Sequence, residues 1–192
     1  MRYTVEMAAV RATPTSPRLG YRELSSGDVD IFHELAVDPH IRRFLFDGQV
    51  VPREWAAAAV ETNRRQLEAS GLGLWLLFDR APATLRPIGF AGFWSFETLG
   101  PDLQLLYALR SEHTGNGLAR EAAAALVDFA RARAGLGDIS AAVDEPNAAS
   151  IRVLEKLGFV RIGEAPGAFD RTLRFRLPAG QPPWGLRAER IP

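Results

Sequence analysis

LLYALRSEHTGNGLARE, residues 105–121, is the stretch on which the fold prediction rests. An apolar run typical of a buried strand ends at Arg110, a polar turn carries Gly115 and Gly117, and a helical pattern begins directly behind them. Glycines let a ligand approach the backbone closely, and the free N–H groups at a helix start favour negative charge. The stretch therefore predicts an anion site, with phosphate as the favoured ligand.

Downstream of this stretch the sequence continues with alternating helix and strand patterns. Apolar residues at every fourth position, from Leu118 to Ala130, predict a helix that ends near Gly135. Residues 139–143 predict a short strand. Asn147 is a predicted N-cap of the next helix, which ends at Gly158. Two further strands are expected at 159–162 and 172–177, joined by a loop over 163–170.

Upstream, the same reasoning predicts a strand, two helices and three more strands. A strand over 18–24 leads to a helix that begins after Ser25 and ends at Asp38-Pro39. A linker over 41–51 precedes a second helix, which begins with Pro52 and ends at Gly71. The expected strands then follow at 72–78, 87–96 and 103–109, and a turn over 79–84 makes the first two of these a hairpin.

This order, β-α-α-β-β-β-α-β-α-β-β, predicts an α/β (mixed α+β) fold. We expect a central, twisted, mostly antiparallel sheet of about seven strands with helices on both faces. We expect residues 18–177 to form one domain. Residues 1–17, which end in Thr13-Pro14-Thr15-Ser16-Pro17, predict a flexible N-terminal arm, and the Pro- and Gly-rich residues 178–192 predict a C-terminal tail.

The composition argues against several classes of function. Lys plus Arg and Asp plus Glu both number 23, so the chain has no net field to attract nucleic acid or a membrane surface. It has no cysteine, which excludes disulfides and a cysteine nucleophile. Three separated histidines lack the spacing of a metal site. With no apolar stretch long enough to span a bilayer and no signal-peptide pattern, we expect a cytoplasmic protein without nucleic-acid or membrane partners, and a homodimer is possible.

Two blocks of the sequence resemble the GNAT superfamily of N-acyltransferases. Residues 115–122, GNGLAREA, are similar to its acyl-CoA pyrophosphate motif. Residues 147–159, NAASIRVLEKLGF, resemble the Asn-x-x-Ser-x-x-x-Leu-x-Lys-x-Gly-Phe signature of its RimJ/RimL-like branch, the ribosomal-protein N-acetyltransferases. The two blocks are about thirty residues apart, each in the expected strand and helix context. The resemblance covers residues 18–177 and implies the GNAT fold with acetyl-CoA as the cofactor.

The resemblance also implies which residues bind the cofactor. The backbone of the strand before the turn pairs with the pantetheine arm, and the turn and helix start hold the pyrophosphate. Asn147, as a cap, and Ser150 also contact the arm. The residues implied on the strand, turn and helix are Tyr107, Ala108, Leu109, Arg110, Thr114, Gly115, Asn116, Gly117, Leu118, Ala119 and Arg120. No metal is implied.

The catalytic residues are less clear from the sequence. Leu154 matches the position at which many members carry a tyrosine that protonates the leaving thiolate, and a leucine has no proton to give. In the RimL-like branch the serine of the second block has a similar role, which makes Ser150 the candidate acid. Gln104 and Ala142 occupy positions that hold a base elsewhere in the superfamily. Glu97 and Asp102 are the remaining carboxylate candidates, with a solvated loop charge or a water relay as the alternatives.

The first block also departs from the superfamily pattern, with Glu112 where Gln or Arg is usual and Thr114 where the branch often has Trp. A carboxylate next to a pyrophosphate is unfavourable unless it points away. We therefore expect transfer of acetyl from acetyl-CoA to a primary amine, either a small molecule or a protein N-terminus, by direct attack in a ternary complex. The alternative is a degenerate acyl-CoA-binding or protein-interaction module without transferase activity.

Overall fold

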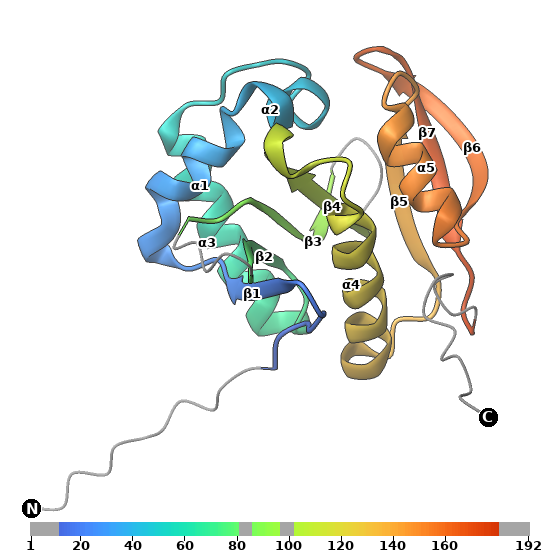
Figure 1. Ribbon diagram of the computed structural model, residues 1–192, viewed down its shortest axis with the longest axis horizontal. Coiled ribbons are helices and arrows are strands. Elements are labelled where there is room, and N and C mark those ends of the chain that lie inside the picture. Colours follow the sequence, from blue (N-terminus) through green and yellow to red (C-terminus); the bar gives the residue numbers. More distant parts are fainter. Residues whose placement is uncertain (1–11, 81–85, 97–101, 181–192) are drawn as a thin grey trace, which may run out of the picture.

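The computed structural model describes residues 12–80, 86–96 and 102–180, and places one twisted sheet at the centre of the molecule (Figure 1). The seven strands lie in the order β1-β2-β3-β4-β5-β7-β6. The strands and helices follow one another along the chain in this order: β1 (Leu19–Glu23), α1 (Val29–Ala36), α2 (Pro39–Leu45), α3 (Arg53–Ser70), β2 (Leu74–Asp79), β3 (Gly89–Ser95), β4 (Leu103–Leu109), α4 (Leu118–Ala134), β5 (Ile139–Asp144), α5 (Ala148–Lys156), β6 (Val160–Gly167) and β7 (Asp170–Leu177). The predicted mixed fold, with a central sheet of seven strands and helices, is confirmed.

The sheet is continuous except between β4 and β5. Neighbouring strands elsewhere pair antiparallel, and β3 pairs with β4 along its whole length, from Gly89 opposite Leu109 to Ser95 opposite Leu103. In contrast, β4 and β5 are parallel and share a single registered pair, Gln104 with Ser140. The two halves of the sheet therefore diverge from this pair toward the carboxyl ends of both strands (Figure 1).

Each face of the sheet carries its own hydrophobic core. Alternate residues of a strand point to opposite faces. On β4, Leu105 and Leu109 lie in the core that includes the buried residues of α4 and α5, whereas Leu106 and Ala108 pack against the core that includes α1 and α3. The odd-numbered residues of β4 thus face α4 and α5. This division decides which side chains can meet beside the opening, the place where β4 and β5 diverge beyond Gln104 and Ser140.

The linker predicted over 41–51 is wrong, because it overlaps a third helix, α2, that precedes β2. Asp38 and Pro39, interpreted as a stop, instead start this helix. The Asp38 carboxylate accepts hydrogen bonds from the backbone N–H groups of His40 (2.9 Å) and Ile41 (3.2 Å), and Pro39 takes a first-turn position, where no N–H is needed. The same dipeptide can end one helix and begin the next.

The loop predicted over 163–170 is also wrong, because most of it is strand. β6 continues to Gly167, and β7 begins at Asp170, so the two form a hairpin with a tight turn. Pro166 argued for a loop, but β6 is the last strand of the sheet, and proline is tolerated on an edge. A register shift between Arg161 and Gly163 marks a bulge, which bends this edge strand.

The other predicted elements are confirmed to within a few residues. Gly71 ends α3 and Gly135 ends α4, both in the left-handed region, with φ of 70° and 61°. The predictions for residues 1–11 and 181–192, and for most of the turn over 79–84, lie outside the described residues. Within the described ranges, every helix is too short or too polar to cross a membrane.

One buried polar side chain joins α3 to the sheet and gives a test of the fold. Asn63 is fully buried, its Oδ1 accepts from the backbone N–H of Leu74 (2.6 Å), and its Nδ2 donates to the carbonyls of Leu24 (3.4 Å) and Leu74 (3.3 Å). We expect Asn63→Ala to lower the free energy of unfolding by about 2 kcal/mol, because it removes the acceptor of the buried Leu74 N–H. The Leu74 carbonyl keeps its bond from the Leu24 N–H. Urea unfolding would measure the loss. An unchanged midpoint would contradict the role given to Asn63.

Candidate cofactor site

The turn before α4 has the backbone shape that its glycines predicted. Gly115 and Gly117 have φ of 80° and 77°, in the left-handed region that favours glycine. Gly117 is the N-cap of α4 and has no side chain to cap the helix, and a Cβ on Gly115 would meet no atom within 4 Å. The first N–H groups of α4 therefore open onto the turn without a capping side chain. An anion can therefore act as the hydrogen-bond partner of these N–H groups, in place of a capping side chain.

The edge of β4 offers a second binding element beside the turn. Past Gln104 the backbone of β4 has no registered partner on β5 among the described residues. Unpaired N–H and C=O groups on a strand edge can bind an extended amide chain as an added strand. A ligand with an anionic group at one end and an amide arm at the other would fit the turn and the edge together.

Ser150, on α5, contacts a residue of this strand, Tyr107. Its hydroxyl is 2.8 Å from the hydroxyl of Tyr107, which is also 3.2 Å from the Ser150 carbonyl oxygen. Tyr107 is on β4 and Ser150 in the first turn of α5, so this contact joins β4 to the helix after β5, beyond the point where the two strands pair. Burial raises the pKa of Tyr107, although its hydrogen bond with Ser150 acts in the opposite direction. The phenol therefore stays protonated and can donate.

The sequence resemblance implied a cofactor contact for the backbone of Tyr107, and no role was predicted for its hydroxyl. The signal available was the alternation along β4, which puts residue 107 on the face of Leu105 and Leu109, toward α5. Leu154, which occupies the usual tyrosine position, is fully buried in the core. The phenol beside the opening thus comes from a strand and not from α5.

Asn147 caps α5 as predicted. Its side-chain oxygen accepts a hydrogen bond from the backbone N–H of Ser150 at 3.2 Å. This bond fixes the first turn of α5, and with it the direction of the Ser150 side chain. A contact between Asn147 and a cofactor stays a prediction.

The charged residues around the turn have different surroundings. Arg110 points away from α4, because its guanidinium contacts Glu34 (2.6 Å) and Asp38 (3.5 Å) on the other face of the sheet. Arg120 is exposed on the first turn of α4. Glu112 is exposed in the short turn 111–113, and its carboxylate accepts a hydrogen bond from the Ser111 hydroxyl at 3.2 Å.

The described residues do not assign a base at Glu97 and Asp102, the two carboxylates predicted as candidates, or at Gln104 and Ala142, the two positions that hold a base elsewhere in the superfamily. Glu97 lies outside the described residues, and Asp102 is exposed. Gln104 is buried at the point where β4 and β5 still pair, and Ala142 has no polar side chain. The structure therefore leaves the base without an assignment among these positions.

Asp144, at the end of β5, is a carboxylate that the sequence analysis passed over. It shares a strand face with Ala142, opposite the face of Val143, which packs in the α4 and α5 core. Burial raises the pKa of Asp144, the Thr172 hydroxyl that donates to it at 2.8 Å lowers it, and Asp47 raises it further. A carboxyl with a raised pKa is better suited to accept a proton near neutral pH.

α2, the helix that the sequence did not predict, makes an aromatic contact with the turn between β6 and β7. The ring of Phe44, on α2, contacts that of Phe169, in the turn between β6 and β7, with centroids 5.6 Å apart. These elements belong to different halves of the sheet (Figure 1). The contact therefore joins the two halves on the side away from α4 and α5.

Residues 18–160 match the family described as the acetyltransferase (GNAT) domain. The chain belongs to the GNAT acetyltransferase family. The match covers most of the chain and includes both the turn before α4 and the first turn of α5. This confirms the superfamily indicated by residues 115–122 and 147–159.

Other proteins share part of the sequence or the fold of this chain. The chain is 33% identical over 107 residues to the uncharacterized protein YkkB of Bacillus subtilis, a match that spans 55% of this chain and only 59% of YkkB. It shares its fold with a protein of Bordetella pertussis assigned to the GnaT family of acetyltransferases (TM-score 0.75, 23% identity, 86% of this chain and 99% of that one). The fold is also that of RimL, a ribosomal L7/L12 α-N-protein acetyltransferase solved in complex with coenzyme A (TM-score 0.71, 19% identity, 86% and 97%).

Proposed function

We propose that this protein is an N-acetyltransferase that moves the acetyl group of acetyl-CoA to a primary amine by direct attack in a ternary complex. The observation that carries the proposal is the combination of the glycine turn before α4 with the unpaired edge of β4. A CoA thioester has a diphosphate at one end of an amide-containing arm, which matches these two elements in kind and in order. RimL, with the same fold, was solved with coenzyme A.

The residues of the chain fit this cofactor. The N–H groups of residues 115–119 hold the diphosphate, and the backbone of residues 107–109 pairs with the pantetheine amides. Thr114 and Arg110, also implied by the sequence, are less suited, because the Thr114 N–H donates to the Ser111 carbonyl (3.1 Å) and the Arg110 N–H to the Ile88 carbonyl (2.9 Å). Arg120, exposed on the first turn of α4, adds positive charge nearby. When bound, acetyl-CoA supplies the acetyl group as an activated thioester.

Ser150 is the residue that we propose as the proton donor to the departing thiolate. Its hydroxyl lies beside the opening, and Tyr107, 2.8 Å away, can donate its own proton to Ser150 Oγ. When Tyr107 is the donor in this hydrogen bond, the hydrogen of the Ser150 hydroxyl is not used in it and can point at the sulfur. Tyr107 thereby orients the acid and keeps its own proton.

A base must take a proton from the amine, and two carboxylates are candidates. Asp144 is supported by its raised pKa and its place on the face opposite α5. Glu97 remains a candidate from the sequence. A water relay to either carboxylate would serve when the amine does not reach it directly.

The acceptor is a primary amine of a small molecule or of a protein N-terminus. The RimJ/RimL-like signature in residues 147–159 supports the second class, since proteins of that branch modify ribosomal proteins. The alternative, a degenerate member that binds acyl-CoA without transferring the acyl group, is favoured by Leu154 and Ala142, which replace usual catalytic residues.

An amine screen divides these two functions. The full chain would be incubated with acetyl-CoA and a panel of amino acids, polyamines, aminoglycosides and peptides with free N-termini, and the release of free CoA thiol would be recorded. We expect release above the hydrolysis rate with at least one amine, and mass spectrometry should find one acetyl group on that amine. Tight CoA binding with no release for any amine would favour the binding module.

A further inference from the structure

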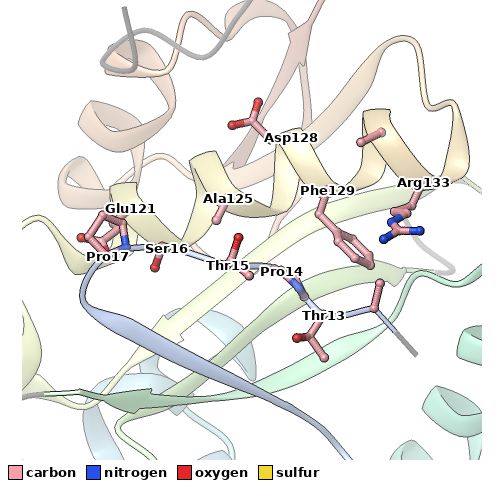
Figure 2. A pocket seen from close by; sticks show the side chains of 12 residues that line it. Thr13, Pro14, Thr15, Ser16, Pro17, Glu121, Ala125, Asp128, Phe129 and Arg133 are labelled. Carbon is pink, nitrogen blue, oxygen red and sulfur yellow. The ribbon is translucent and has the colours of Figure 1, made fainter. Parts of the chain in front are cut away.

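The chain segment before β1 lies against α4, next to the cofactor turn. Figure 2 shows residues 13–17 running along the helix, with Pro17 beside Glu121. Pro14 is buried, and the Tyr21 hydroxyl donates to Ser16 Oγ at 3.3 Å. The end of the segment that was expected to be a flexible arm is therefore packed along α4 where the structure describes it. It delivers the next residue, Arg18, to the first turn of the helix.

Arg18 is held against that turn by three hydrogen bonds. Its backbone N–H donates to Glu121 Oε1 (2.7 Å) and its Nε donates to Glu121 Oε2 (2.6 Å). Its Nη1 donates to the carbonyl oxygen of Asn116, between the two glycines, at 2.9 Å. One guanidinium thus joins β1, the glycine turn and the start of α4, although almost a hundred residues separate Arg18 from Asn116 in sequence.

Glu121 is suited to hold this position. Burial raises its pKa, but the hydrogen bonds from the Arg18 backbone and side chain outweigh burial, and the pKa is lowered overall. The carboxylate therefore stays ionised at neutral pH and keeps the guanidinium in place. A negative charge in the first turn of α4 also interacts favourably with the helix dipole.

The remaining nitrogen of Arg18 faces the turn. A Cβ built on Gly117 would have Nη2 of Arg18 as its nearest neighbour, at 3.7 Å. Nη2 has no hydrogen-bond or ion-pair partner within the described ranges, and half of the side chain is exposed. Its two N–H donors are therefore available to a ligand on the side of the turn from which glycine keeps side-chain atoms away.

We propose that Arg18 is a further cofactor-binding residue, which donates from Nη2 to the diphosphate of CoA while Glu121 and Asn116 hold its guanidinium in place. The inference rests on the proposed function, since it needs CoA at the turn. Arginine is suited to this task because its planar group can bond Glu121, a backbone carbonyl and a phosphate with different edges at once. Because the guanidinium is already fixed, little side-chain entropy is lost when CoA binds.

Calorimetric titration with CoA tests the proposal. We expect Arg18→Ala to weaken CoA binding about tenfold, the loss of roughly one charge-assisted hydrogen bond. Dephospho-CoA, which keeps the diphosphate and lacks the 3′-phosphate, should lose the same factor. Arg53→Ala is the matched control, because Arg53 is also an exposed arginine in an ion pair, with Asp30. We expect the Arg53→Ala variant to bind CoA as tightly as the wild type does.

A second variant keeps the test valid if Arg18→Ala does not fold. Arg18→Lys retains the charge, but all of its N–H donors are on one nitrogen and do not reproduce the separate positions from which Nε, Nη1 and Nη2 of Arg18 would bond Glu121, Asn116 and a phosphate. We expect its CoA affinity to lie between those of the wild type and Arg18→Ala, at an unchanged melting temperature. Wild-type affinity for both ligands in folded Arg18→Ala and Arg18→Lys would overturn the inference, as would a loss confined to CoA, which would assign Arg18 to the 3′-phosphate.

The same titrations separate this inference from the proposed function. If the wild-type chain binds no CoA, the proposed function fails and the inference with it. If the wild type binds CoA and both Arg18 variants bind it equally well, only the role of Arg18 fails.

Discussion

Gly117→Val is expected to weaken acetyl-CoA binding at least about a hundredfold, through two effects that add. A β-branched residue at φ 77° is strained, and the strain distorts the start of α4. In addition, the new side chain would occupy the space in front of the helix N–H groups, where the diphosphate must lie. Calorimetry with acetyl-CoA would measure the loss.

Gly135→Val is the control that separates strain from blocking. Gly135 ends the same helix in the same left-handed region, at φ 61°, and a Cβ there would meet nothing within 4 Å, whereas a Cβ on Gly117 would have Nη2 of Arg18 at 3.7 Å. We expect the two variants to lower the melting temperature by similar amounts, whereas only Gly117→Val should lose the cofactor. Equal cofactor affinities in the two variants would mean that the diphosphate does not lie at this turn.

Ser150→Ala is expected to reduce the rate of acetyl transfer about a hundredfold, the usual contribution of a positioned acid. Its affinity for acetyl-CoA should stay close to that of the wild type, because the Asn147 cap binds the backbone of residue 150 and survives the change. Single-turnover measurements with an amine found by the screen would test this, since slow product release does not mask chemistry there. A wild-type rate would contradict the assignment of Ser150 as the acid.

Tyr107→Phe tests whether the phenol acts through Ser150. We expect a rate about tenfold below the wild type, and a double variant, Tyr107→Phe with Ser150→Ala, no slower than Ser150→Ala alone, because both changes remove one interacting unit. Tyr21→Phe is the control, as that hydroxyl bonds Ser16 on the segment beside α4. Fully additive losses would mean that Tyr107 acts independently of Ser150.

The sequence predicted the parts of the fold that follow from local pattern. The turn at Gly115 and Gly117, the cap at Asn147 and the stops at Gly71 and Gly135 all appear where the residue types placed them. Each depends on backbone geometry within one turn of chain, which single residues decide.

The errors arose where the same local signal serves two structures. Asp38-Pro39 is as good a helix start as a helix end, and Pro166 is as compatible with an edge strand as with a loop. Only the place of α2 and β6 in the whole sheet resolves these cases.

The site contacts missed by the sequence analysis are long-range. Tyr107 and Ser150 are 43 residues apart, and Arg18 and Glu121 are 103 apart. The motif at 115–122 contains Glu121, but nothing in the motif states that its carboxylate binds an arginine before the first strand. Such pairs are created by strand order, and spacing within one motif does not encode them.

Titration of the full chain with acetyl-CoA in a calorimeter tests the central claim most directly, namely that the turn before α4 and the edge of β4 form an acyl-CoA site. The account predicts saturable binding at one site per chain, in competition with CoA and lost in Gly117→Val but kept in Gly135→Val. The absence of heat from binding at millimolar acetyl-CoA, or equal binding by Gly117→Val, would contradict it.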